Sequence, residues 1–275
     1  MSKYTEYLRK SSIIPQKRFG QNFLVDEGFL NKIINYANIS SEDDIVEIGP
    51  GLGFLTELII NKPPHKIDCI EIDPDLCNLL RGNFLNFSFL HLHNVDAMRF
   101  DFASVLSEKT KIVANLPYNI SVPLLMKLLK EYIFAPDMYV LVQKEVAQRI
   151  CSLGGKKFGT VSVISNFLAN TEILFDIPPE AFNPKPKVYS TFIKISPKND
   201  YLEKKKLFHH IEKLCKILFM KKRKKLIKIL NVNFKEIHFL DILNDLNINH
   251  ESRPENLSIE QLAGLAQHLN ILRLI

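Results

Sequence analysis

The segment NLPYN, residues 115–119, brings together side chains that can bind a flat ligand with polar edges. Asn115 carries an amide with donors and acceptors, Pro117 fixes the backbone, and Tyr118 offers a flat ring with a polar tip. A nucleobase is a ligand of this kind. Asn and Pro are also common turn residues, so the segment alone is more typical of a strand that ends in a turn. Other segments are needed to decide between these interpretations.

A glycine-rich segment, EIGPGLG (47–53), follows a predicted strand and opens a predicted helix. Glycines there let the backbone approach a ligand, and the orphan N–H groups of the helix suit a carboxylate or phosphate. A dinucleotide fingerprint that starts at Gly49 needs its third glycine at position 54, which is Phe54. The spacing, with Gly51 and then Gly53, instead resembles the first motif of S-adenosylmethionine-dependent methyltransferases.

Two acidic residues stand at the ends of the next two predicted strands, where ligands of parallel sheets bind. Glu71 lies about twenty residues beyond the glycines and could accept hydrogen bonds from both ribose hydroxyls of a nucleotide-like cofactor. Asp96 follows the third strand and could accept one from an adenine amino group. Either acid alone is more typical of a helix cap or a surface charge, but the series favours a cofactor site.

Positive charge is concentrated near the C-terminus. Between Lys204 and Lys228 there are eleven Lys or Arg residues and one acid, Glu212, within a chain of net charge +6. Such a concentration favours a polyanionic partner, because phosphate contacts give salt-sensitive affinity. A solvated helix face is the alternative interpretation of a lysine run.

The elements that must position these residues alternate between strand and helix through about residue 150, which predicts a Rossmann-like, mainly parallel α/β sheet. Two later β-rich segments predict an antiparallel finish to this sheet, and an apolar stripe from Tyr201 onward predicts a small all-α domain. We therefore expect two domains, 1–198 and 199–275. The predicted strands are 43–49, 66–73, 87–92, 111–115, 138–143, 171–178 and 187–196, and the predicted helices are 52–61, 74–84 and 121–132.

Bulk composition is that of an ordinary globular protein, with 46% hydrophobic and 24% charged residues among 275. The start of the chain has no apolar segment of signal-peptide length, and no stretch approaches about 18 uninterrupted apolar residues, so we expect a cytoplasmic protein without a membrane span. The cysteines form no CxxC pair, so neither zinc nor disulfides are expected. They are Cys69, Cys77, Cys151 and Cys215.

Six separated segments, in order and spacing, resemble the ribosomal RNA adenine N6-dimethyltransferases of the small subunit. The likeness covers roughly residues 16–196, and FMKKRKKL (219–226) is similar to a basic stretch in that family's helical domain. The segment NLPY is similar to the fourth motif of amino methyltransferases. The six segments are KRFGQNFL (17–24), EIGPGLG (47–53), IEID (70–73), NLPY (115–118), VQKEVAQRI (142–150) and FNPKPKV (182–188).

The resemblance implies that S-adenosyl-L-methionine is the cofactor and that two methyl groups pass to N6 of each of two adjacent adenosines. The implied substrate lies near the 3′ end of 16S rRNA in an immature 30S subunit, with a role in subunit biogenesis. We expect a monomer without a metal. The implied cofactor residues are Asn22, Leu24, Gly49, Gly51, Glu71, Asp96 and Asn115; those around the base are Asn115, Leu116, Pro117, Tyr118 and Phe182; those on RNA are Lys221, Lys222, Arg223, Lys224 and Lys225.

Adenine N6 is a poor nucleophile, because its lone pair is delocalised into the ring. The Asn115 oxygen and the Leu116 carbonyl could accept its two hydrogens while Tyr118 stacks on the base, and a target base would be single-stranded or flipped out. The family usually has glycine where this chain has Val95. Two alternatives stay open: a large-subunit rRNA methyltransferase of the macrolide-resistance type, and an assembly factor that acts mainly by binding.

Overall fold

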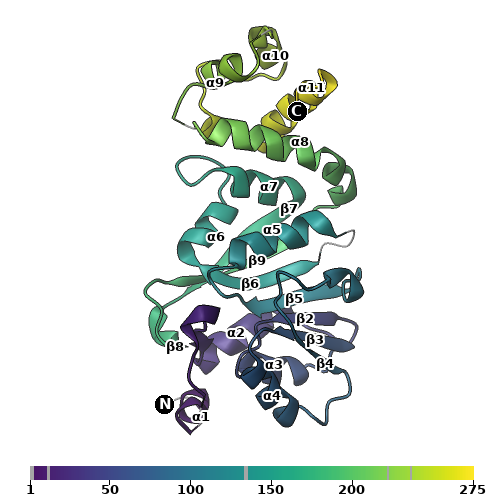
Figure 1. The fold of residues 1–275 in the computed structure, drawn as a ribbon, viewed down its shortest axis with the longest axis vertical. Helices are drawn as coiled ribbons and strands as arrows, with labels where there is room; N and C mark the ends of the chain where they lie inside the picture. Colours follow the sequence, from purple (N-terminus) through teal and green to yellow (C-terminus); the bar gives the residue numbers. More distant parts are fainter. Residues whose placement is uncertain (1–2, 11–12, 133–135, 222, 236) are drawn as a thin grey trace. The chain divides into compact units, whose positions relative to one another are not determined.

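The computed structural model describes residues 3–10, 13–132, 136–221, 223–235 and 237–275 (Figure 1). The chain divides into two compact units, each formed by two segments. The first consists of Met1–Ala147 with Glu172–Ser196, and the second of Gln148–Thr171 with Pro197–Ile275.

The second unit resumes at Pro197, close to the boundary expected at residue 198, and it also includes residues 148–171. Helix α7 (Thr160–Leu168) packs against α8 (Tyr201–Phe219) and α11 (Ile259–Ile271), so residues 148–171 group with the C-terminal helices. No local sequence pattern indicates this grouping, because α7 lies between segments that belong to the sheet. The function expected of each domain stays a prediction.

A seven-stranded sheet has the order β4-β3-β2-β5-β6-β9-β7. Strands β2, β3, β4, β5 and β6 pair in parallel, and β9 pairs with β6 antiparallel, which confirms the predicted mostly parallel sheet with an antiparallel finish. The strands are β2 (Asp44–Ile48), β3 (Lys66–Glu71), β4 (Leu90–Asn94), β5 (Thr110–Asn115), β6 (Asp137–Gln143), β7 (Ala169–Ile177) and β9 (Ser190–Pro197).

Strand β4 begins later than predicted, at Leu90 instead of residue 87. The Phe87 N–H donates to the Phe84 carbonyl in a turn, and the Phe87 ring packs edge-on against Phe89. The apolar character of this stretch therefore serves packing beside the sheet. A separate two-stranded sheet pairs β1 (Phe23–Leu24) with β8 (Phe182–Asn183).

The helices of the first unit begin at recognisable caps. Asp26 caps α2 through the Phe29 N–H, and Asp73 caps α4, whose first residue is Pro74. Helix α4 packs against β3 and β4 (Figure 1). The helices here are α1 (Lys3–Lys10), α2 (Glu27–Ala37), α3 (Phe54–Ile60), α4 (Pro74–Asn83) and α5 (Ser121–Glu131); α6 (Lys144–Ile150) crosses the boundary between the units.

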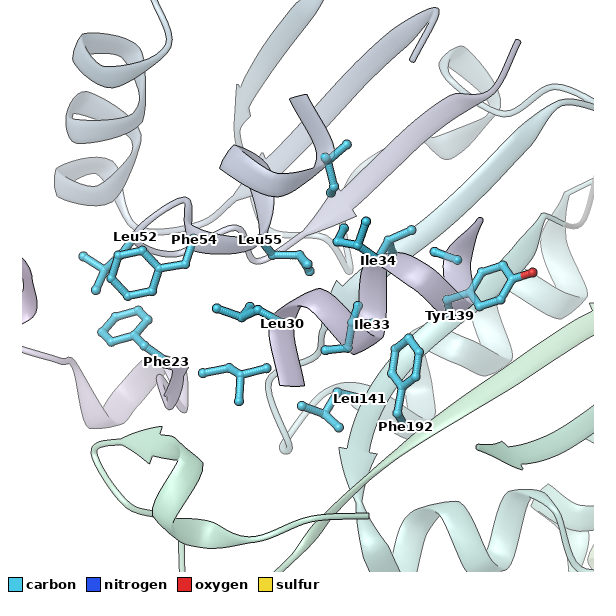
Figure 2. Close-up of a cluster of buried hydrophobic side chains, with 14 of the residues drawn as sticks. Phe23, Leu30, Ile33, Ile34, Leu52, Phe54, Leu55, Tyr139, Leu141 and Phe192 are labelled. Carbon is cyan, nitrogen blue, oxygen red and sulfur yellow. The ribbon is translucent and has the colours of Figure 1, made fainter. Parts of the chain in front are cut away.

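The core of the first unit joins the glycine turn to the sheet. Figure 2 shows the α2 side chains Leu30 and Ile33 between Phe54, at the start of α3, and Leu141 of β6. All four are buried. Because this cluster reaches the start of α3, it fixes the turn that precedes that helix.

The second unit is helical, as predicted. Ile211, Leu214 and Leu218 of α8 are fully or almost fully buried, which confirms the apolar stripe. Helix α11 begins at a capping box in which Ser258 and Gln261 bond each other's backbone N–H. The remaining helices are α9 (Leu226–Asn233) and α10 (Phe239–Asp245).

Within the described ranges, none of the helices has both the length and the apolar character needed to cross a membrane. The same residues contain no cluster of three or more His, Cys, Asp or Glu side chains suited to hold a metal ion. All four cysteines are free thiols.

Candidate active site

A pocket of about 200 Å³ opens at the carboxyl ends of β2, β3 and β5. The ends of parallel strands share one edge of a sheet, so residues far apart in sequence meet there. The pocket brings together most of the residues expected from the sequence. These are Asn22, Gly49, Gly51, Glu71, Asp96, Asn115, Leu116, Pro117 and Tyr118.

The three glycines of the turn between β2 and α3 have different structural roles. Gly49 and Gly51 have φ of +69° and +61°, and a Cβ on Gly51 would lie 2.9 Å from the Phe23 ring, so both positions favour glycine. Gly53 also has a positive φ, +81°, and lies against α4, where an added Cβ would come within 2.7 Å of Phe84 and 2.8 Å of Leu80. The first two glycines shape the pocket, and the third permits close packing of α3 on α4.

Glu71 is held in place by backbone donors. Its Oε2 accepts the Gly51 N–H at 3.1 Å and its Oε1 accepts the Asp73 N–H at 3.0 Å. The side chain is buried, and this desolvation raises the pKa of the carboxyl. Each carboxylate oxygen keeps a further lone pair, so Glu71 can still accept from a ligand in the pocket.

Asp96 forms the turn after β4. Its Oδ1 accepts the Met98 N–H at 2.9 Å, and its carbonyl accepts the Arg99 N–H at 2.8 Å. The preceding Val95 donates its N–H to the Glu71 carbonyl at 3.0 Å and is not among the described residues with positive φ. A glycine is therefore not required at position 95, and the turn tolerates the valine.

Asn115 is oriented by the N-terminal segment. Its Nδ2 donates to the Asn22 carbonyl at 2.9 Å, which leaves Oδ1 as the acceptor of the amide. Asn22 in turn donates from Nδ2 to the Gly20 carbonyl at 3.1 Å. The segment before β1 thus lies against the end of β5.

Gln21 links the segment before β1 to the start of α4 by a hydrogen bond. No role was predicted for Gln21 from the sequence. Its Nε2 donates to Asp73 Oδ2 at 2.8 Å, and its Oε1 accepts the Gln16 N–H at 2.6 Å. Asp73 is buried and also caps α4. In the sequence, Asp73 directly precedes Pro74, a pattern typical of a helix cap that does not indicate the bond to Gln21.

The rest of the NLPY segment joins the sheet to α5. The Leu116 N–H donates to the Leu141 carbonyl at 3.2 Å, and Leu116 is buried. The Tyr118 hydroxyl lies 2.6 Å from Ser190 Oγ, and burial raises the pKa of Tyr118. Ser190 is a further residue that the sequence did not reveal.

Leu24 and Phe182 lie outside the lining of this pocket. Their backbones pair directly across the small sheet, and each side chain is 4% exposed within the hydrophobic core. The structure therefore does not bring Phe182, which was expected around the target base, to the pocket wall. The roles assigned to these two residues stay predictions.

Glu47, the acid that precedes the glycines, is a buried carboxyl outside the main pocket. It is 1% exposed, and its carboxylate accepts the Thr56 hydroxyl at 2.6 Å. Burial is the main cause that raises the pKa of Glu47 to about 8. It lines a small cavity beside Asn115. Its acidity is suppressed by its surroundings, in contrast to a surface carboxylate.

The basic segment, defined here as residues 221–228, borders a surface depression in the second unit. The depression is lined by Lys221, Arg223, Lys224, Lys225 and Lys228. Lys222 lies outside the described residues. Several lysines of α8 form ion pairs along their own helix, and Lys225 pairs with Glu251. Lys221, Arg223 and Lys224 form no ion pair with an acid among the residues that the structure describes, whereas Lys228 adds to the effect of Lys225 in lowering the pKa of Glu251.

The pocket fits S-adenosylmethionine. The Glu71 carboxylate can accept from ribose hydroxyls, the apolar side chains of Ile72 and Leu76 suit an adenine ring, and the open turn at Gly49 and Gly51 leaves room for an amino acid tail. The fold and the pocket together define a class: α/β methyltransferases that hold this cofactor at the carboxyl edge of a mostly parallel sheet.

Comparisons with known proteins identify the family. The profile described as "Ribosomal RNA adenine dimethylase" matches residues 15–270. The Ribosomal RNA small subunit methyltransferase A of Legionella pneumophila (strain Corby) is 39% identical over 257 residues, which cover 93% of this chain and 98% of that protein. The protein of the same name from Fusobacterium nucleatum is 38% identical, covering 91% and 96%.

Solved structures agree with this assignment. A dimethyladenosine transferase from Plasmodium falciparum has a TM-score of 0.77 at 27% identity, covering 90% of this chain and 96% of that one. The 23S rRNA methyltransferase ErmE, with a TM-score of 0.72 at 20% identity over 90% of this chain and 99% of that one, shares the fold. The chain belongs to the ribosomal RNA adenine dimethylase family and is an S-adenosylmethionine-dependent methyltransferase.

Proposed function

We propose that this enzyme dimethylates N6 of two adjacent adenosines near the 3′ end of 16S rRNA, in an immature small subunit. The observation that carries the proposal is that one pocket holds both the Glu71 carboxylate and the Asn115–Tyr118 segment. A cofactor bound through the first would lie beside a base bound by the second. The full-length relatives named as small-subunit enzymes support the substrate.

The NLPY segment positions the base. S-adenosylmethionine, when bound, supplies an electrophilic methyl group. The Asn115 Oδ1, oriented through the Asn22 carbonyl, and the Leu116 carbonyl accept the two N6 hydrogens and direct the nitrogen lone pair out of conjugation. The Tyr118 ring stacks on the base. The methylated nitrogen is acidic and releases its proton without a strong base, so no histidine is assigned to the reaction.

The basic segment supplies affinity for the RNA backbone. Lys221, Arg223 and Lys224 are not neutralised by acidic partners among the described residues, so they can contact phosphates. Such contacts release counterions and weaken as salt rises. Binding through this segment also suits a role in subunit assembly, and the two roles are compatible in one protein.

The large-subunit alternative has weaker support. The likeness to ErmE is one of fold, whereas relatives at 38–39% identity over more than nine-tenths of the chain carry the small-subunit name. The glycine turn and the NLPY segment do not separate these substrates by themselves.

Methylation of isolated particles tests the proposal. The enzyme is incubated with labelled cofactor and, in separate reactions, with immature small subunits or with large subunits from cells that lack this methylation, and the RNA is digested for mass spectrometry. We expect N6,N6-dimethyladenosine at two adjacent positions, and none with the Asn115→Ala variant. Label found only in large-subunit RNA, or no label in either particle, would contradict the proposed substrate.

A further inference from the structure

The ring of Tyr118 is anchored at both of its ends. At the backbone, the Tyr118 carbonyl accepts the Ser121 hydroxyl at 3.2 Å, and the Pro117 carbonyl accepts the Ile120 N–H at 3.2 Å. At the far end, the phenol hydroxyl lies 2.6 Å from Ser190 Oγ. The ring can therefore neither swing about the turn nor move its tip without breaking a hydrogen bond.

Ser190 is itself a rigid anchor. It is fully buried and is the first residue of β9, where it stands opposite Gln143 of β6. Beside it, the Lys144 N–H donates to the Tyr189 carbonyl at 2.9 Å, which extends the pairing of the two strands. The sheet, and not a loop, thus determines the position of the hydroxyl that meets Tyr118.

This contact determines how the tyrosine can take part in the reaction. A hydroxyl bonded to Ser190 is turned away from a ligand, so Tyr118 meets the base with its face. Burial raises the pKa of the phenol, which therefore stays protonated at neutral pH and keeps the hydrogen bond. Because the ring is already fixed in the free enzyme, it can align the base by stacking without a further loss of conformational entropy during methyl transfer.

We propose that Ser190 is a positioning residue for methyl transfer, whose hydroxyl holds the Tyr118 ring in the plane that stacks on the target adenine. The inference rests on the proposed function, because it assigns Tyr118 to the base. A purely structural hydrogen bond would affect stability alone. A positioning contact affects the rate of transfer while the binding of both substrates is preserved.

A double-mutant cycle separates these two roles. We expect Ser190→Ala and Tyr118→Phe each to lower the single-turnover rate roughly 3- to 10-fold, the amount that corresponds to one lost hydrogen bond. Because both remove the same contact, the double variant should lose no more than either single variant. The dissociation constant for adenosylhomocysteine and the KM for immature subunits should stay within about twofold of wild type.

Two controls complete the test. Ser190→Thr retains a hydroxyl and should restore most of the rate. Thr191→Val removes the neighbouring hydroxyl, which bonds Asp176 at 2.6 Å, and should leave the rate unchanged. Thermal unfolding of every variant reports any loss of stability.

Three results would overturn the inference: a wild-type rate for Ser190→Ala, losses that multiply in the double variant, or a matching loss in Thr191→Val. Each is distinguishable from failure of the proposed function, in which the wild-type enzyme does not methylate small-subunit RNA at all.

Discussion

The pocket at the sheet edge and the basic segment, residues 221–228, satisfy their polar groups in opposite ways. In the pocket, Glu71 and Asn115 each have a protein partner at about 3 Å that fixes their orientation before any ligand arrives. In the basic segment, Lys221 and Lys224 are exposed and have no acidic partner within the described residues. Preorganised groups hold a ligand in one defined orientation. Solvated cations attract phosphates in many relative orientations, and this attraction depends on salt.

The first prediction concerns the most deeply buried acid of the pocket region. The pKa of Glu47, about 8, exceeds the ordinary value of 4.5, so the folded protein binds an extra proton between these pH values. The resulting stability is fully present below pH 4.5 and is lost as pH rises to about 8. The loss amounts to roughly 4–5 kcal/mol at most.

Glu47→Gln should remove this pH dependence, because an amide keeps the acceptor for Thr56 without a titrating proton. Denaturant unfolding between pH 5 and pH 8.5 measures the effect. The matched control is Glu42→Gln, because the Glu42 carboxylate is 79% exposed. This change should leave the pH dependence of the free energy of unfolding as it is in the wild type. If the free energy of unfolding changed equally with pH in the wild type and in Glu47→Gln, burial would not raise the pKa of Glu47.

The second prediction tests whether preorganisation in the pocket serves the cofactor. Glu71→Ala should raise the dissociation constant of adenosylhomocysteine roughly 10- to 100-fold, because hydrogen bonds to a charged acceptor are lost. Calorimetry measures this. Asp75→Ala, which removes an exposed acid from α4, should bind normally. An unchanged dissociation constant for Glu71→Ala would reject the ribose assignment.

The third prediction tests the opposite character of the basic segment. Replacing Lys221 and Lys224 by Gln should lower affinity for immature subunits about 10-fold near physiological salt and reduce the salt slope by about two. The same double change at Lys204 and Lys206, which are ion-paired on α8, should have a smaller effect. Filter binding across a salt series compares the two double variants. If both show the same dependence of affinity on salt, the basic segment is an ordinary solvated surface and not an RNA contact.

The fourth and smallest prediction concerns the fastening of the N-terminal segment. Gln21→Ala removes the bond to Asp73 and should weaken adenosylhomocysteine binding a few-fold, because the segment that borders the pocket must then be ordered on binding. The loss should appear mainly as faster dissociation in stopped-flow measurements. A slower association rate alone would contradict this assignment.

Strand-end chemistry could be predicted from the sequence, because parallel strands expose their carboxyl ends at one edge. Glu71, Asp96 and Asn115 were expected there for that reason, and the structure brings all three to one pocket. The sheet and its antiparallel finish were predictable from the alternation of apolar runs with helical segments.

Long-range partners could not be predicted in this way. Ser190 is 72 residues from Tyr118 and has the sequence context of an ordinary strand residue. The bond between Gln21 and Asp73 likewise depends on a tertiary approach that no local pattern reveals. Phe182 was expected at the base because its motif suggested it, but the pairing of β8 with β1 turns its side chain into the core.

The bond from Asn115 to the Asn22 carbonyl connects the proposed binding sites of the two ligands. The same amide holds the N-terminal segment through its Nδ2 and leaves its Oδ1 for the proposed contact with the base. If cofactor binding orders that segment further, it also orients the acceptor, and by thermodynamic reciprocity base binding would then strengthen cofactor binding by the same factor.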